Sequence, residues 1–156
     1  MAERAPNPKA LREMIAREAH ALGFSGFGIA PASGSDGMAE RLQAFVSLGR
    51  HGTMGWMAET VQRRSSPQSM WPDAKSAIML AFNYGPDGDA LGNLERRDVA
   101  NISVYARHRD YHDVMKGKLK ELAGWMVAQA GGDVKVFVDT APVMEKPLAA
   151  AAGLGW

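Results

Sequence analysis

The end of the chain holds the feature that most constrains its fold, an apolar run that leads into an acid and a proline-marked turn. Residues 134–138 are mostly valine and phenylalanine, which predicts a buried strand, and Asp139 follows directly. Pro142 marks a turn in the segment that follows, and residues 143–152 are expected to form a final helix. Because strand ends in α/β folds face a crevice, we expect Asp139 to lie at a functional site.

Helical and strand patterns alternate along the rest of the chain. Apolar residues recur at helical spacing over residues 8–22, 39–48 and 110–130. Strand patterns occupy residues 24–30, 76–84 and 102–105, and 76–84 is apolar enough for a strand covered on both faces. Residues 49–75 are expected to be irregular, and the polar residues 85–101 to be either a mobile lid or a dispensable insertion. This alternation predicts one domain of the α/β or α+β class, a layered sheet with flanking helices.

The composition limits the chemistry that these residues can perform. There are 18 basic and 17 acidic residues, so any contact with nucleic acid must come from a local patch. The absence of cysteine excludes disulfides, thiol catalysis and cysteine-ligated zinc or iron–sulfur clusters within the 156 residues. No apolar run approaches the ~20 residues that span a bilayer, and the N-terminus lacks the apolar core of a signal peptide. We expect a soluble, cytoplasmic protein with no membrane contact.

Two roles are open to Asp139. As a general acid it would need burial to raise its pKa from about 3.9 toward neutrality, so that it holds a proton to donate. Alternatively its carboxylate caps the turn or helix that follows, which is a common role for aspartate in this setting. The residues alone favour the cap.

Residues 51–57 and Arg64 form a candidate binding segment. Gly52 and Gly55 allow the backbone to approach a large ligand, while Met54 and Trp56 offer broad, adaptable apolar contact, which suits a large planar cofactor. Ordinary core packing under a loop is the alternative. Arg64 could bind a phosphate or carboxylate with its guanidinium fork, or could be a solvated arginine before a proline turn.

A second candidate segment, residues 105–112, interleaves aromatic rings with arginines at an expected junction between strand and helix. Tyr105, Arg107 and His112 lie where free backbone N–H groups at a helix start favour anions. The segment therefore predicts phosphate or nucleotide binding, or a helix start that merely carries charge.

Five segments, taken in order, resemble the N-terminal part of epoxyqueuosine reductase. They are residues 51–57, Arg64 with Pro67, residues 72–76 leading into Asn83 and Tyr84, residues 105–107 with 110–112, and residues 138–145 with 152–156. Each segment alone is common, whereas five in register are specific. The resemblance covers nearly the whole chain from about Leu11 onward.

The resemblance implies a function in transfer RNA modification. The family removes the epoxide oxygen of epoxyqueuosine at the anticodon wobble position, using cobalamin and two 4Fe–4S clusters. It implies that residues 1–156 are the cobalamin-binding domain, cut before a ferredoxin-like domain that carries the clusters, and that this piece alone is inactive. The implied fold is similar to the cobalamin-binding domain of reductive dehalogenases and to flavin nitroreductases.

The resemblance also assigns roles to residues. It makes Asp139 the proton donor, which reverses the role that spacing alone favours. It places six residues near the cofactor or substrate: Gly52, Met54, Arg64, Tyr105, Arg107 and His112. The implied partners are tRNA and a reductant that supplies electrons. We expect Arg107 and Arg109 to contribute to tRNA binding, and we expect a monomer. A non-catalytic cobalamin- or flavin-binding module and a flavin nitroreductase-like enzyme are the alternatives.

Overall fold

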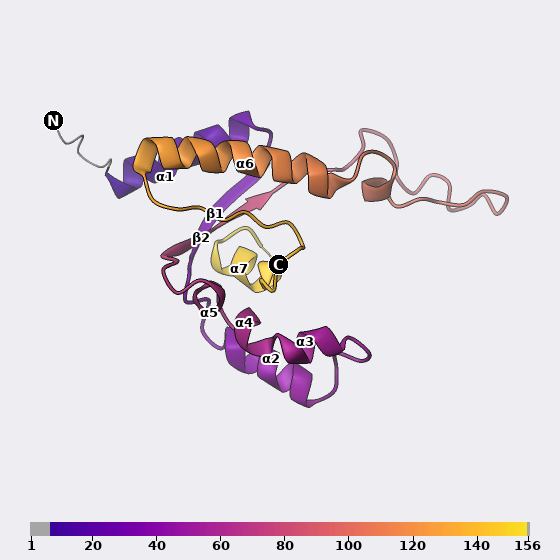
Figure 1. The fold of residues 1–156 in the computed structure, drawn as a ribbon. Helices are drawn as coiled ribbons and strands as arrows, with labels where there is room; N and C mark the ends of the chain where they lie inside the picture. The colour runs from indigo at the N-terminus through magenta and orange to yellow at the C-terminus, as the bar shows by residue number, and fades with distance from the viewer. Residues whose placement is uncertain (1–6, 156) are drawn as a thin grey trace. The chain divides into compact units, whose positions relative to one another are not determined.

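The computed structural model describes residues 7–155, which form two compact units (Figure 1). The first unit contains the chain up to Ser25 together with Phe82–Val138. The second contains Gly26–Ala81 together with the chain from Asp139 onward. The expected single domain is therefore divided into two units, each built from segments that are distant in sequence.

In the first unit, helices α1 (Pro8–Ala21) and α6 (Tyr111–Ala130) lie side by side (Figure 1). Ile15 and Ala19 of α1 and Leu122 of α6 are buried, as their helical spacing predicts. The Nζ of Lys118 donates a hydrogen bond of 2.6 Å to the carbonyl of Leu22, so a charged donor from α6 satisfies a free carbonyl at the end of α1.

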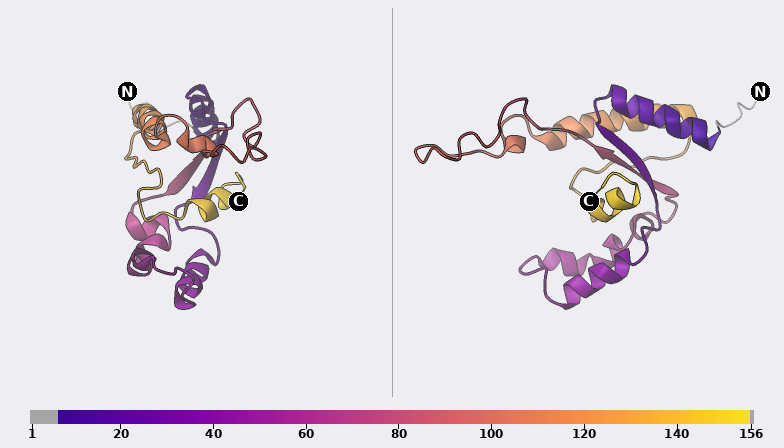
Figure 2. Two further views of the ribbon diagram at one scale, coloured as in Figure 1. Left: turned by 90° about the vertical axis from the view of Figure 1, so that its right-hand side faces the viewer. Right: turned by 180° about the vertical axis from the view of Figure 1, so that it is seen from behind.

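Two predicted strands of the first unit are wrong. Residues 102–105 overlap a short 3-10 helix, η1 (Val104–Ala106), and form no strand. Residues 134–138 are irregular, because no other strand of the described chain pairs with them, although Val138 is buried. Residues 85–101 contain neither helix nor strand and extend away from α6 as a long arm (Figure 2).

The second unit is built on an antiparallel pair of strands, β1 (Gly26–Pro31) and β2 (Ser76–Ala81). Helix α7 (Glu145–Ala151) packs against both strands, and its Leu148 is 1% exposed in a core shared with Ala30 and Met38. Because β2 is only partly buried and pairs antiparallel, the expectation of a strand covered on both faces is wrong.

Four further helices complete the second unit: α2 (Met38–Ser47), α3 (Gly55–Glu59), α4 (Val61–Arg64) and α5 (Pro67–Met70). The last three lie where the sequence predicts an irregular segment, so that prediction is wrong. Helices of four or five residues make little more than one turn, which is too short for an apolar period to emerge.

The fold is a small antiparallel sheet with helices, which confirms the expected α+β class with helices flanking a sheet. The helices predicted over 8–22, 39–48, 110–130 and 143–152 are confirmed by α1, α2, α6 and α7. Among residues 7–155, no helix combines the length and apolarity that crossing a bilayer requires.

Candidate functional site

Asp139 has an unusual backbone conformation. Its φ of +52° is the only positive value at a residue other than glycine in the described chain. This left-handed conformation is uncommon for residues with a side chain, and aspartate is among those that tolerate it best. The backbone N–H of Asp139 donates a hydrogen bond to Oε1 of Glu145, 3.2 Å away. The turn after Val138 therefore closes on the first residue of α7.

Glu145 and Asp139 form a pair of interacting carboxyl groups. Burial raises the pKa of Glu145 above its ordinary value of 4.5, although the N–H of Asp139 acts in the opposite direction. The negative charge of Asp139 and a hydrogen bond between the two side chains raise this pKa further. A hydrogen bond between two carboxyl groups needs a proton, so the pair keeps one to a higher pH than a lone glutamate would.

The surroundings of this pair are apolar. The strands that pack against α7, β1 and β2, carry no ionisable side chain, and neither do residues 140–144. Lys146, the next residue of α7, is exposed. Burial and the Asp139 carboxyl group are thus the causes that raise the pKa of Glu145, and the backbone N–H of Asp139 lowers it.

The structure corrects the predicted setting of Asp139. It does not end a strand, because residues 134–138 are irregular. Nor is it the N-cap of the last helix, since α7 begins after Met144, which makes no side-chain capping hydrogen bond. Asp139 is exposed, whereas Glu145 is half-buried. Burial therefore favours the protonated form of Glu145.

Residues 51–57 present an open surface. A Cβ at Gly52 or Gly55 would meet nothing within 4 Å, and the φ of Gly52 is +58°. Met54 and Trp56 are 40% and 49% exposed, which excludes core packing as their role in this structure. Exposed apolar side chains beside accessible backbone fit a broad, flat ligand.

Arg64 lies against this surface. Its guanidinium carbon is 4.7 Å from the centre of the Trp56 ring, a cation–π arrangement. Its Nε donates to Oγ1 of Thr60 at 2.8 Å, and Thr60 in turn donates to the carbonyl of Trp56 at 2.7 Å. The structure thus joins Arg64 to the 51–57 segment, and the arginine is not simply solvated.

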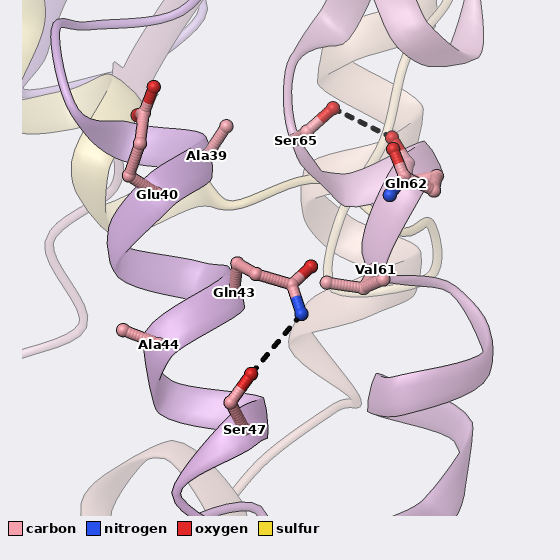
Figure 3. Close-up of a pocket in the computed structure, with 8 residues that line it drawn as sticks. All are labelled: Ala39, Glu40, Gln43, Ala44, Ser47, Val61, Gln62 and Ser65. Carbon is pink, nitrogen blue, oxygen red and sulfur yellow. Dashed lines mark hydrogen bonds between the residues drawn. The ribbon is translucent and has the colours of Figure 1, made fainter.

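A groove between α2 and α4 is a feature that the sequence does not reveal (Figure 3). It has a volume of about 490 Å³ and is open to solvent. Small and amide side chains dominate its lining: Ala39, Glu40, Gln43, Ala44, Ser47, Val61, Gln62 and Ser65. None of the candidate site residues expected from the sequence lines this groove. Two hydrogen bonds of its lining, Gln43 to Ser47 and Ser65 to Gln62, are internal to their helices or turns, and the hydroxyl of Ser65 also lies 2.7 Å from that of Ser69.

In the first unit, Tyr105 and His112 are linked through Tyr111. The rings of Tyr105 and Tyr111 meet edge to face at 6.1 Å, and the rings of Tyr111 and His112 stack at 4.2 Å. Asp110 caps α6 by accepting the N–H of His112 at 2.9 Å, and its Oδ1 lies 2.7 Å from the imidazole Nδ1. The backbone bond and then the side-chain bond from His112 lower the pKa of Asp110.

Arg107 stabilises the polar arm. Its Nε donates to the carbonyl of Ile102 at 2.8 Å, and its Nη2 contacts Oδ1 of Asn101 at 3.1 Å and the carbonyl of Ala90 at 3.4 Å. The neighbouring Arg109 is exposed. Of the two arginines expected to contact nucleic acid, Arg107 thus already holds a loop together.

Known proteins match this sequence and fold. Residues 64–140 match the family described as "Epoxyqueuosine reductase QueG, DUF1730". The epoxyqueuosine reductase of Cyclobacterium marinum is 39% identical over 146 residues, which are 92% of this chain and 46% of that protein. The chain is a homologue of the N-terminal part of epoxyqueuosine reductases. It spans less than half the length of the curated relatives that it matches.

Solved epoxyqueuosine reductases share the fold. One, with a tRNA-Tyr stem loop that carries epoxyqueuosine, matches with a TM-score of 0.76 at 25% identity, over 96% of this chain and 40% of that one. Another is the Bacillus subtilis enzyme with its catalytic aspartate loop swung out of the active site. It matches with a TM-score of 0.70 at 22% identity, also over 96% of this chain and 40% of that one.

The residues expected from the resemblance to epoxyqueuosine reductases fall into two sets. Gly52, Met54, Arg64 and Asp139 belong to the second unit, and Tyr105, Arg107 and His112 to the first. The sequence analysis gave no separate role to Glu145, which the structure brings against Asp139. The available signal was a second acid six residues after Asp139, at the start of the final predicted helix.

Proposed function

We propose that residues 1–156 form the cobalamin-binding part of an epoxyqueuosine reductase that acts on tRNA in the cytoplasm. The observation that carries this proposal is the Asp139–Glu145 carboxyl pair, found in a chain homologous to these enzymes. A relative whose structure contains an epoxyqueuosine-modified stem loop supports the choice of substrate. Within residues 7–155, no three or more His, Cys, Asp or Glu side chains gather in a group that could hold a metal ion.

Asp139 is the proton donor in this proposal. Opening an epoxide develops negative charge on its oxygen, and a positioned carboxylic acid relieves that charge, which is worth roughly 10²–10⁴-fold in rate. Asp139 is exposed, which suits contact with a bound nucleotide, and burial raises the pKa of its partner Glu145. The swung-out aspartate loop of the Bacillus subtilis enzyme supports placing this group on an irregular segment.

The exposed surface of residues 51–57 would hold the cofactor. Trp56 and Met54 supply apolar contact, Gly52 leaves the backbone accessible, and Arg64 is held beside them. When bound, cobalamin supplies electrons through its reduced cobalt. The 4Fe–4S clusters need cysteine ligands, so the proposal places them outside residues 1–156 and makes this piece inactive alone.

The first unit would contribute contacts to the nucleotide or the cofactor. The ring series from Tyr105 to His112 offers stacking surfaces for unpaired bases, and Arg107 and Arg109 offer positive charge for phosphates. The expected fold similarity to the cobalamin-binding domain of reductive dehalogenases and to flavin nitroreductases is part of this proposal, as is a monomeric state.

Replacing Asp139 with asparagine tests the proposal. In the complete enzyme with its cofactors, Asp139→Asn is expected to reduce deoxygenation by about 10²-fold or more, because the amide cannot donate a carboxylic proton. Cobalamin binding, followed by absorbance, should stay unchanged. Asp133→Asn, which alters an exposed aspartate six residues earlier, is the matched control. Undiminished turnover in Asp139→Asn would refute the role of Asp139.

A further inference from the structure

The exposure of Asp139 poses a chemical difficulty for a proton donor. Water stabilises the ionised form of an exposed carboxyl group, so the position of Asp139 does not by itself favour the protonated form that a donor requires. Nothing in the irregular segment around Asp139 buries it. A donor in this position needs a neighbour that stores a proton.

Glu145 has the position that such a neighbour needs. It is the first residue of α7, and α7 is anchored by the buried Leu148 and by the close approach of Ala152 to Gly28 of β1. Its Oε1 accepts the backbone N–H of Asp139 at 3.2 Å. A fixed helix thus holds a carboxyl group against a residue of the preceding turn.

We propose that Glu145 is a positioning residue for this reaction, which holds the Asp139 turn through its backbone N–H and shares one proton with the Asp139 carboxylate. The inference rests on the proposed function, since it assumes that Asp139 is the donor. Burial and the adjacent negative charge both favour retention of this proton.

Transfer from Glu145 to Asp139 breaks an O–H bond on Glu145 and forms one on Asp139, and the pair keeps a charge of −1. Delivery to the substrate oxygen breaks the Asp139 O–H bond and leaves both groups ionised. Water then returns one proton to the pair. Electrons come from the reductant and do not pass through either carboxyl group.

Glu145→Gln separates proton sharing from a purely structural role. Glutamine keeps a carbonyl oxygen for the N–H of Asp139 and has the same size, but it cannot store or pass a proton. Its amide can donate to ionised Asp139 and so favours loss of the Asp139 proton. A residue that only fastens the turn would tolerate this change. Lys146→Gln, at the exposed next position of α7, is the control.

The test is the pH dependence of kcat for the complete enzyme on an epoxyqueuosine stem loop. In Glu145→Gln, we expect the basic limb to move down by about one pH unit or more and kcat at pH 7 to fall about tenfold or more. KM for the stem loop and cobalamin binding should be unchanged. A wild-type profile in Glu145→Gln, with inactive Asp139→Asn, overturns the role of Glu145 and leaves the proposed function standing. Full activity in Asp139→Asn overturns the assignment of Asp139 as the donor, and a wild-type enzyme that does not deoxygenate the stem loop overturns the proposed function itself.

A spectroscopic measurement on the wild-type protein removes any dependence on how the variants fold. Infrared difference spectra against pH report the carbonyl stretch of protonated carboxyl groups. We expect a protonated carboxyl signal that persists to a pH above the range in which isolated carboxyl groups ionise. If all carboxyl groups of the wild-type protein are ionised by that pH, the shared proton does not exist.

Discussion

The packing of α7 on β1 makes a sharp prediction for Gly28→Ala. A Cβ at Gly28 would overlap the carbonyl oxygen of Ala152 and would lie 2.8 Å from the Cβ of Ala152. The group in the way is backbone at the end of α7, which cannot turn aside as a flexible side chain can. The end of α7 must therefore move away from β1.

The size of the effect follows from two opposing contributions. Overpacking of this kind costs typically about 1–3 kcal/mol. Replacing glycine by alanine lowers the conformational entropy of the unfolded chain, which stabilises the folded state by about 0.4–1 kcal/mol. We therefore expect Gly28→Ala to lower the free energy of unfolding by about 1–2 kcal/mol. The matched control is Gly124→Ala in the middle of α6, where a Cβ meets nothing within 4 Å and the helix should gain about 0.5–1 kcal/mol.

Urea unfolding followed by circular dichroism measures both variants. The expected result is a lower midpoint for Gly28→Ala and a higher one for Gly124→Ala, each with an unchanged dependence on urea concentration. If Gly28→Ala is as stable as the wild type while Gly124→Ala behaves as expected, α7 does not approach β1 as the structure has it. The anchoring of Glu145 would then need another explanation.

Two further predictions concern charge. Because the folded-state pKa of Glu145 is raised above its ordinary value of 4.5, wild-type stability should fall as the pH rises from 4.5 through the folded-state value. The thermal stability of Glu145→Gln should thus equal that of the wild type below pH 4.5 and exceed it near pH 7. If the stability of the two proteins depends on pH in the same way, the pKa of Glu145 is not raised. Charge reversal at Arg107 and Arg109 should flatten the salt dependence of tRNA binding by about two counterions, whereas reversal at the exposed Lys9 should leave it unchanged. An unaltered slope in the double variant would mean that neither arginine touches phosphate.

The long helices could be predicted from the sequence because their signals are local. Apolar spacing in α6 is combined with a capping aspartate, Asp110, and in α1 with a glycine, Gly23, that ends the helix. Residues 134–138 carry the composition of a buried strand, but a strand also needs a partner, which composition does not specify. Val138 is buried without any such pairing.

The candidate site was predictable only in part, for a similar reason. The position of Asp139 between an apolar run and a proline turn predicts a functional site there. Its interaction with Glu145 depends on a left-handed backbone at Asp139, which allows the turn to close on α7. Aspartate permits this conformation without requiring it, so the sequence could not indicate that the two acids meet.

The left-handed backbone at position 139 also limits which substitutions can be interpreted and which replacements natural variation can explore. Asparagine shares the shape of aspartate and tolerates this conformation, so Asp139→Asn removes an acid without refolding the turn. Valine or isoleucine there would combine lost chemistry with a distorted main chain, and an inactive variant of that kind would be uninformative. Asparagine thus removes the acid at this position and keeps the backbone conformation of the turn.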